Sequence, residues 1–176
     1  YAPAELAEIL EPRAEQGLDP DGWSRDVLEA VADEVAGRAR DAIQTLKWAA
    51  RLAGERDRDT ITSAEIVDGH EEAQREIRAA ALKSLPYHHQ VLYELVRAKG
   101  PIKSHDLHES YDSVAEQAYS GQTGTPVGKR SRTQKLRKLA EYDLLAWNEH
   151  KGNTRTYQVT DDRIESSVEL RTTPRN

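Results

Sequence analysis

The chain has 176 residues, which is room for one large domain or two small ones. Because it contains no cysteine, a disulfide framework and a thiolate metal site are excluded. No apolar run approaches the roughly 18 residues that a membrane span needs, and no signal-peptide pattern opens the chain. We therefore expect a cytoplasmic protein without a membrane partner.

The composition is acidic and unusual. The chain has 31 acidic and 25 basic side chains, a formal charge of −6, and 17 arginines against 8 lysines. Such a surface suits a salt-rich cytoplasm, because carboxylates keep a protein soluble when its charge is screened, and ordinary compositional drift is the alternative. Since methionine is absent, we expect Tyr1 to be an internal residue of a longer protein.

The charge is unevenly distributed along the chain. Residues 1–85 carry −8, residues 86–160 carry +3 and residues 161–176 carry −1. The change of sign falls near Pro86, where a helical pattern also ends, and this coincidence predicts a domain boundary. The expected parts are a domain over residues 1–82, a domain over residues 83–160, and a C-terminal tail over residues 161–176 that holds a short helix or strand before it becomes disordered.

The first half has the apolar periodicity of helices throughout. Pro3 suits a first helical turn, and Ser24 is a candidate N-cap for a second helix. Thr62 or Ser63 can cap a fourth, with Glu65 in its first turn. The apolar stripes that predict the first three helices are Leu6, Ile9 and Leu10, then Val27, Leu28, Val31 and Val35, and then Ala39, Ala42, Ile43, Leu46 and Ala50.

The second half follows the order of a winged helix. A helix that ends at Lys99-Gly100-Pro101 precedes a short strand at Ile102-Lys103, and Ser104 is positioned to cap the next helix. A third helix covers residues 131–142, and an alternating pattern with a turn at Lys151–Asn153 predicts a β-hairpin. The expected fold is therefore mainly α, a helical domain followed by a winged helix-turn-helix with a small hairpin.

The clearest chemical feature is a reversal of charge at residues 129–138, where six of ten residues are cations and none is acidic. Helical periodicity turns Leu136 and Leu139 toward a core and places Arg132 and Lys135 on roughly one face. In a winged helix the third helix enters the major groove of duplex DNA. The candidate DNA-binding residues on this helix are Lys129, Arg130, Ser131, Arg132, Thr133, Gln134, Lys135 and Lys138.

The predicted hairpin tip is basic as well. It carries His150, Lys151, Asn153 and Arg155, which we add to the candidate DNA-binding residues. A basic wing lies along the phosphate backbone or in the minor groove, where arginine is favoured. One basic helix alone could simply be a solvated surface, but a basic helix and a basic wing in this order, in an acidic chain, favour binding to double-stranded DNA in the nucleoid.

Other residue patterns do not make a site. His105 and His108 lie three residues apart without an evident third ligand, so no metal site is expected. Gly121, Gly124 and Gly128 lack the lysine and the preceding strand of a phosphate-binding loop. We find no nucleophile with a base and no paired carboxylates, and we expect no catalytic residue and no enzymatic activity in this chain.

Several segments resemble the Orc1/Cdc6 replication initiators, which are AAA+ ATPases of archaea. The stretch Ala36–Leu46, with the sequence AGRARDAIQTL, resembles their sensor-2 helix. Residues 1–13 resemble the segment that begins their helical lid, residues 61–67 resemble the last lid helix, and residues 85–92 resemble the start of their C-terminal winged helix. The resemblance covers nearly the whole of residues 1–160.

The resemblance implies specific roles. Arg40 matches the sensor-2 arginine, which reaches from the lid to the nucleotide phosphates, whereas Arg38 points to another face. The resemblance also implies that the intact protein binds ATP or ADP with Mg²⁺, recognises a replication origin and helps to load the replicative helicase. The nucleotide-binding core is absent from these residues, so no cofactor is expected here, and the missing N-terminal ATPase domain is an expected partner.

Two other functions remain open from the sequence. A winged-helix transcription regulator would use the helical half for dimerisation and would bind palindromic half-sites. A protein-interaction module would instead present the basic helix to an acidic partner protein.

Overall fold

The computed structural model describes residues 1–150 and 154–170, without the side chain of His150. The chain forms two compact units, Tyr1–Glu76 and Ile77–Asn176. Each unit has a hydrophobic core of its own.

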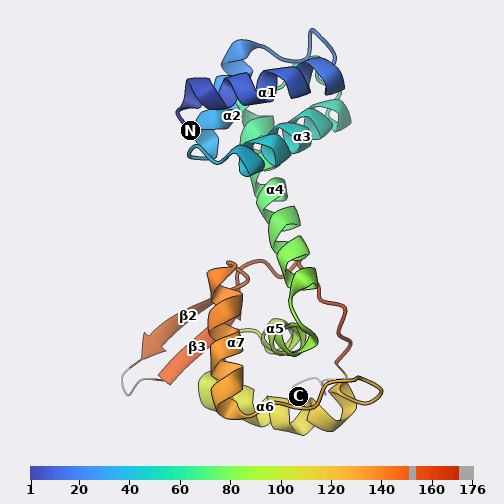
Figure 1. Ribbon diagram of the computed structural model, residues 1–176, viewed down its shortest axis with the longest axis vertical. Helices are drawn as coiled ribbons and strands as arrows, with labels where there is room; N and C mark the ends of the chain where they lie inside the picture. Colours follow the sequence, from blue (N-terminus) through green and yellow to red (C-terminus); the bar gives the residue numbers. More distant parts are fainter. Residues whose placement is uncertain (151–153, 171–176) are drawn as a thin grey trace. The chain divides into compact units, whose positions relative to one another are not determined.

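The first unit is built from helices. α1 (Pro3–Gly17) packs against α2 (Arg25–Glu34) and α3 (Ala39–Glu55), and the first part of α4 (Ser63–Ser84) completes the unit (Figure 1). Ser24 caps α2 as expected, because its hydroxyl accepts the N–H of Val27 at 3.3 Å. The core follows the predicted apolar stripes, and its fully buried members include Leu6, Leu10, Leu28, Val31, Ala42 and Ala49.

α3 and α4 approach each other at backbone distance. A Cβ added at Gly69 of α4 would lie 2.7 Å from the backbone nitrogen of Ala49 of α3, which is closer than real Cβ atoms come. Glycine at this position therefore permits the close packing of the two helices.

α4 begins with one half of a capping box, in which the carboxylate of Glu65 accepts from Thr62. The N–H of Thr62 donates to the carboxylate of Glu65 at 3.1 Å, and the Thr62 hydroxyl donates to the same carboxylate. The buried Glu65 side chain also forms ion pairs with Arg56 and Arg58, each at 3.0 Å. The Thr62 hydroxyl above all, together with Arg56, holds the pKa of Glu65 at about 2, so this carboxylate is charged at neutral pH.

The second unit is a winged helix. Its elements are α5 (Tyr87–Lys99), β1 (Ile102–Lys103), α6 (Ser104–Ala118), α7 (Lys129–Glu141), β2 (Leu145–His150) and β3 (Thr154–Val159). The strands form an antiparallel sheet in the order β1-β3-β2, in which Tyr157 lies opposite Ile102 on one side and Trp147 on the other. The predicted fold class, a helical domain followed by a winged helix with a small hairpin, is confirmed.

One predicted cap is wrong. Ser104 is the first residue of α6, and Lys103 holds the N-cap position without a side-chain cap. The Ser104 hydroxyl donates instead to the backbone oxygen of Arg155 at 3.2 Å. This bond joins the start of α6 to β3, so Ser104 contributes to tertiary packing rather than to capping.

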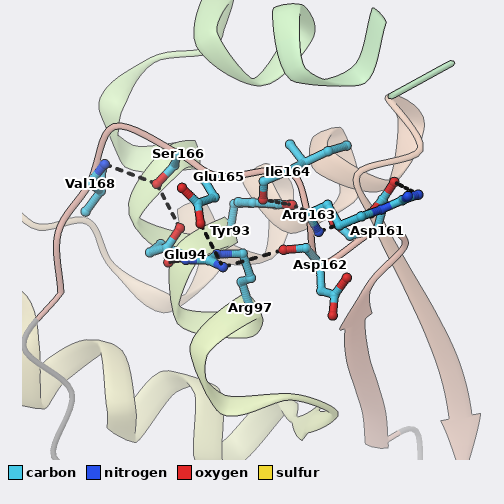
Figure 2. A network of polar contacts seen from close by, with 10 residues as sticks. All are labelled: Tyr93, Glu94, Arg97, Asp161, Asp162, Arg163, Ile164, Glu165, Ser166 and Val168. Atoms are coloured by element: carbon cyan, nitrogen blue, oxygen red, sulfur yellow. Dashed lines mark hydrogen bonds and ion pairs between the residues drawn. The ribbon is translucent and has the colours of Figure 1, made fainter. Parts of the chain in front are cut away.

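Residues 161–170, called the strap below, pack against α5 without forming a helix or a strand, so the expectation of a regular element there was wrong (Figure 2). The Tyr93 hydroxyl donates to the backbone oxygen of Ile164 at 2.8 Å, and the Ser166 hydroxyl donates to Glu94 at 3.0 Å. Ile164 and Val168 are buried in the core of this unit. Side chains of α5, rather than a backbone ladder, therefore hold the strap in place.

Candidate nucleic-acid interface

α7 presents one face to the core and another to solvent. Leu136 and Leu139 are buried, and the helix packs against α5 and β2 (Figure 1). Helical periodicity places the opposite side at positions 130, 134, 137 and 138, and all four of these residues are exposed. We call this surface the outer face of α7; it consists of Arg130, Gln134, Arg137 and Lys138.

Three cations of α7 have no carboxylate partner in the part of the chain that the structure describes. Lys129, Arg130 and Arg137 are exposed, and no acidic side chain of residues 1–149 or 154–170 lies within ion-pairing distance of them. Lys138, by contrast, pairs with Glu141 at 3.1 Å. Positive charge that is unpaired at the first turn of a helix adds to the positive end of the helix dipole and attracts anions.

Arg137 was missing from the candidates chosen by sequence. It lies seven residues after Arg130 and three after Gln134, and this spacing places the three side chains on one helical face. The 3.6-residue period contains this signal, whereas the face predicted from the sequence is centred on Arg132 and Lys135.

Arg132 departs from its expected placement. Only 7% of its side chain is exposed. Its guanidinium donates to the backbone oxygens of Val127 at 2.8 Å and His108 at 3.2 Å, and to the Asp112 carboxylate at 2.5 Å. Position 132 lies four and seven residues before the two buried leucines and so shares their face. Arg132 is therefore corrected from a surface cation to a core residue, and we leave it out of the proposed contacts.

The other polar candidates on α7 have local partners. The Thr133 hydroxyl donates to the backbone oxygen of Lys129 at 3.0 Å, and the ammonium of Lys135 donates to the Ser131 hydroxyl at 3.1 Å. These three side chains are half-buried, whereas Gln134 is exposed. Gln134 is thus the uncharged candidate on the outer face.

The wing is the hairpin of β2 and β3, and its described residues provide less unpaired positive charge than expected. Arg155 of β3 is half-buried, its guanidinium pairs with Glu149 of β2 at 2.9 Å, and it lies 5.1 Å from the centre of the Trp147 ring. The candidates Lys151 and Asn153, and the side chain of His150, lie outside the described residues.

In the first unit, Arg38 and Arg40 differ in their surroundings. Arg38 precedes α3 and pairs with the buried Asp41 at 3.0 Å. Arg40 is exposed in the first turn of α3, and the described part of the chain places no carboxylate within ion-pairing distance of it. Of the two arginines, Arg40 is the one free to reach an external anion.

Comparison with known proteins bears on both units. Residues 7–71 match the family model described as the Cdc6 AAA+ ATPase-type lid domain. ORC1-type DNA replication protein 9 of Halobacterium salinarum is 30% identical over 166 residues, which cover 94% of this chain and 44% of that protein. ORC1-type DNA replication protein 1 of the same organism is 33% identical over 111 residues, or 63% of this chain and 36% of that protein.

Over both of its units, the chain is similar to the Orc1/Cdc6 replication proteins.

The solved structure of the Aeropyrum pernix ORC1 protein in complex with DNA has the same fold. It matches 93% of this chain and 44% of that protein, with a TM-score of 0.65 and 20% sequence identity. The chain spans less than half the length of the Orc1/Cdc6 relatives it matches. That the relatives include Halobacterium proteins agrees with the salt-adapted composition.

The similarity to the Orc1/Cdc6 proteins bears on the functions left open by the sequence. The relatives that the chain matches are named as replication proteins, which favours an initiator over a transcription regulator. Arg40 lies inside the residues that match the lid model. None of the helices in residues 1–150 and 154–170 combines the length and the apolar character of a membrane span.

Proposed function

We propose that this chain supplies duplex-DNA binding to an Orc1/Cdc6-type replication initiator that recognises origins. The observation that carries the proposal is that Lys129, Arg130 and Arg137 of α7 are exposed and have no carboxylate partner among the described residues, in a chain of net charge −6. Phosphate contacts by such side chains provide a large share of the affinity of a protein for DNA. The DNA complex of the Aeropyrum pernix ORC1 protein supports the proposal.

In this proposal residues 83–160 form the DNA-binding winged helix. Lys129, Arg130 and Arg137 contact phosphates and position the outer face of α7 in a major groove, where Gln134 reads a base edge. Lys135, Lys138, Ser131 and Thr133 flank this face, and Arg155 with the wing residues His150, Lys151 and Asn153 follows the backbone beside it.

Residues 1–82 form the lid of the proposed initiator. Arg40 acts there as the sensor-2 arginine toward ATP or ADP with Mg²⁺, bound by an ATPase domain outside this chain. The chain by itself then has no ATPase activity, and the intact protein binds origins and helps to load the replicative helicase.

The DNA-binding proposal is tested by fluorescence anisotropy. A labelled duplex of about 30 base pairs is titrated with the chain over a series of salt concentrations, with origin and scrambled sequences compared. The expected result is binding that weakens linearly on a log–log plot against salt, as release of counterions from DNA requires. Equal competition by poly-glutamate of the same total charge would instead favour the protein-interaction module.

The role of Arg40 is tested in the intact protein with its ATPase domain. Arg40→Ala should weaken ATP binding, because a guanidinium that pairs with phosphate is lost. Arg38→Ala is the matched control, since Arg38 already pairs with Asp41 and should leave ATP binding unchanged. An equal loss in both variants would contradict the assignment.

A further inference from the structure

The start of α7 has no side-chain cap. Gly128 holds the N-cap position and provides no side chain to accept the free N–H groups of the first turn. Lys129 and Arg130 follow at once, so the place where α7 begins decides where these two cations lie. Some other contact must fix that start.

Val127 provides this contact, because both its N–H and its backbone oxygen are hydrogen-bonded to side chains. Its N–H donates to the Tyr111 hydroxyl at 3.1 Å, and its backbone oxygen accepts from Arg132 Nε at 2.8 Å. Arg132 lies one turn into α7 and therefore reaches back over the first turn of its own helix. Together the two side chains tie the residue before Gly128 to α6 and α7.

The Arg132 side chain is itself rigidly held. Its guanidinium lies over the Tyr111 ring and donates to the backbone oxygen of His108, both on α6. The Tyr111 hydroxyl donates to that of Tyr119 at 2.8 Å, and Tyr119 shares a 2.7 Å hydrogen bond with His88 Nδ1. The anchor thus extends through three helices and does not depend on one contact.

Asp112 provides the counter-charge. A cation near the positive end of a helix is unfavourable, and so is a charge removed from water. Asp112 Oδ1 lies 2.5 Å from the Arg132 guanidinium, and this hydrogen bond lowers the pKa of Asp112. The carboxylate therefore remains charged at neutral pH and compensates the buried arginine.

We infer that Arg132 is a positioning residue for DNA binding. It fixes the start of α7, and with it the places of Lys129 and Arg130, without touching DNA. This inference rests on the proposed function. It divides the basic stretch into cations that contact phosphate and one that holds the contacting helix in place.

The test compares Arg132→Gln with Arg130→Gln in anisotropy titrations over salt concentration. Arg132→Gln should weaken duplex binding about tenfold, the effect of losing a charge-assisted hydrogen bond, and should leave the log–log salt slope unchanged. Arg130→Gln should lower the magnitude of that slope by about one. Hydrogen exchange of the Val127 amide should accelerate in Arg132→Gln but not in Arg130→Gln.

Two further variants separate positioning from general stability. Tyr111→Phe retains the ring under Arg132 but removes the acceptor of the Val127 N–H, and it should also weaken binding at an unchanged slope. Val114→Ala opens the core of the same unit on α6. The variants are compared at a urea concentration at which all of them are folded. There Val114→Ala should bind DNA with the wild-type affinity, and its Val127 amide should exchange as in the wild type when compared with other core amides.

The outcomes are distinct. A salt slope lowered by about one in Arg132→Gln would show a direct phosphate contact and overturn the inference, as would an affinity loss in Val114→Ala equal to that in Arg132→Gln. An unchanged affinity in Arg132→Gln beside weaker binding in Arg130→Gln would overturn the inference alone. Failure of the wild-type chain to bind duplex would overturn the proposed function as well.

Discussion

The guanidinium carbon of Arg132 lies 4.0 Å from the centre of the Tyr111 ring, inside the core between α6 and α7. The most basic stretch of the chain therefore contains two kinds of cation. Arg130 and Arg137 face solvent without an ion pair in the described structure, whereas Arg132 is enclosed and neutralised by Asp112. Counting charges along the sequence cannot separate these kinds, and the geometry does.

Replacing Glu65 should remove a stabilisation of the first unit that depends on pH. The folded pKa of Glu65, about 2, lies below its ordinary value of 4.5. The charged carboxylate therefore stabilises the fold above about pH 4.5, and this contribution is lost as the pH falls toward 2. Glu65→Gln should have a lower Tm than the wild type at pH 7, and the difference should shrink between pH 4.5 and 2.

The exposed Glu71 of α4 provides the control for that experiment. Glu71→Gln should have the Tm of the wild type at pH 7. A gap between wild type and Glu65→Gln that stays constant down to pH 2 would show that the ionised carboxylate is not the stabilising form.

Gly69 and Gly54 should respond to alanine in opposite directions. A Cβ at position 69 would meet the backbone of Ala49, whereas a Cβ at Gly54 of α3 would have nothing within 4 Å. Gly69→Ala should therefore separate α3 from α4 and lower the Tm. Gly54→Ala should raise stability by about 0.4–1 kcal/mol, because alanine restricts the unfolded chain. Equal Tm values for the two variants would refute the close helix contact.

Removing the hydroxyl of Tyr93 should loosen the strap. This hydroxyl donates to the backbone oxygens of Ile164 and Asp161, and Tyr93 is fully buried. Tyr93→Phe leaves a buried carbonyl without its donor and should cost about 1–2 kcal/mol in urea unfolding. Tyr142→Phe is the control, since Tyr142 is 42% exposed and should change stability by less than about 0.5 kcal/mol. A Tyr93→Phe variant as stable as this control would show that the strap does not depend on the bond.

The sequence predicted those parts of the structure that depend on local periodicity. The helices, the Ser24 cap, the bond from the Thr62 N–H to Glu65 and the hairpin all follow from spacing and from side-chain chemistry within a few residues. The strap was predicted incorrectly because its position depends on Tyr93 and Glu94, about 70 residues earlier in the chain.

The candidate interface was predicted only in part, because it too depends on contacts between residues far apart in the chain. The exposed cations of α7 could be located from charge and order, but the prediction of Arg132 as a surface residue was wrong because it lies on the core stripe. Its partners, Tyr111 and Asp112, lie on another helix, and no periodicity within α7 indicates them. The outer face centred on Gln134 could have been predicted by considering each residue's position around the helix as well as its charge.

The salt dependence of duplex binding by the double variant Arg130→Gln with Arg137→Gln tests the central claim most directly. If both guanidiniums contact phosphates, the log–log salt slope should fall in magnitude by about two relative to the wild type. Lys83→Gln, which removes an exposed cation of α4, should leave the slope unchanged. A double variant with the slope and affinity of the wild type would contradict the assignment of DNA binding to the outer face of α7.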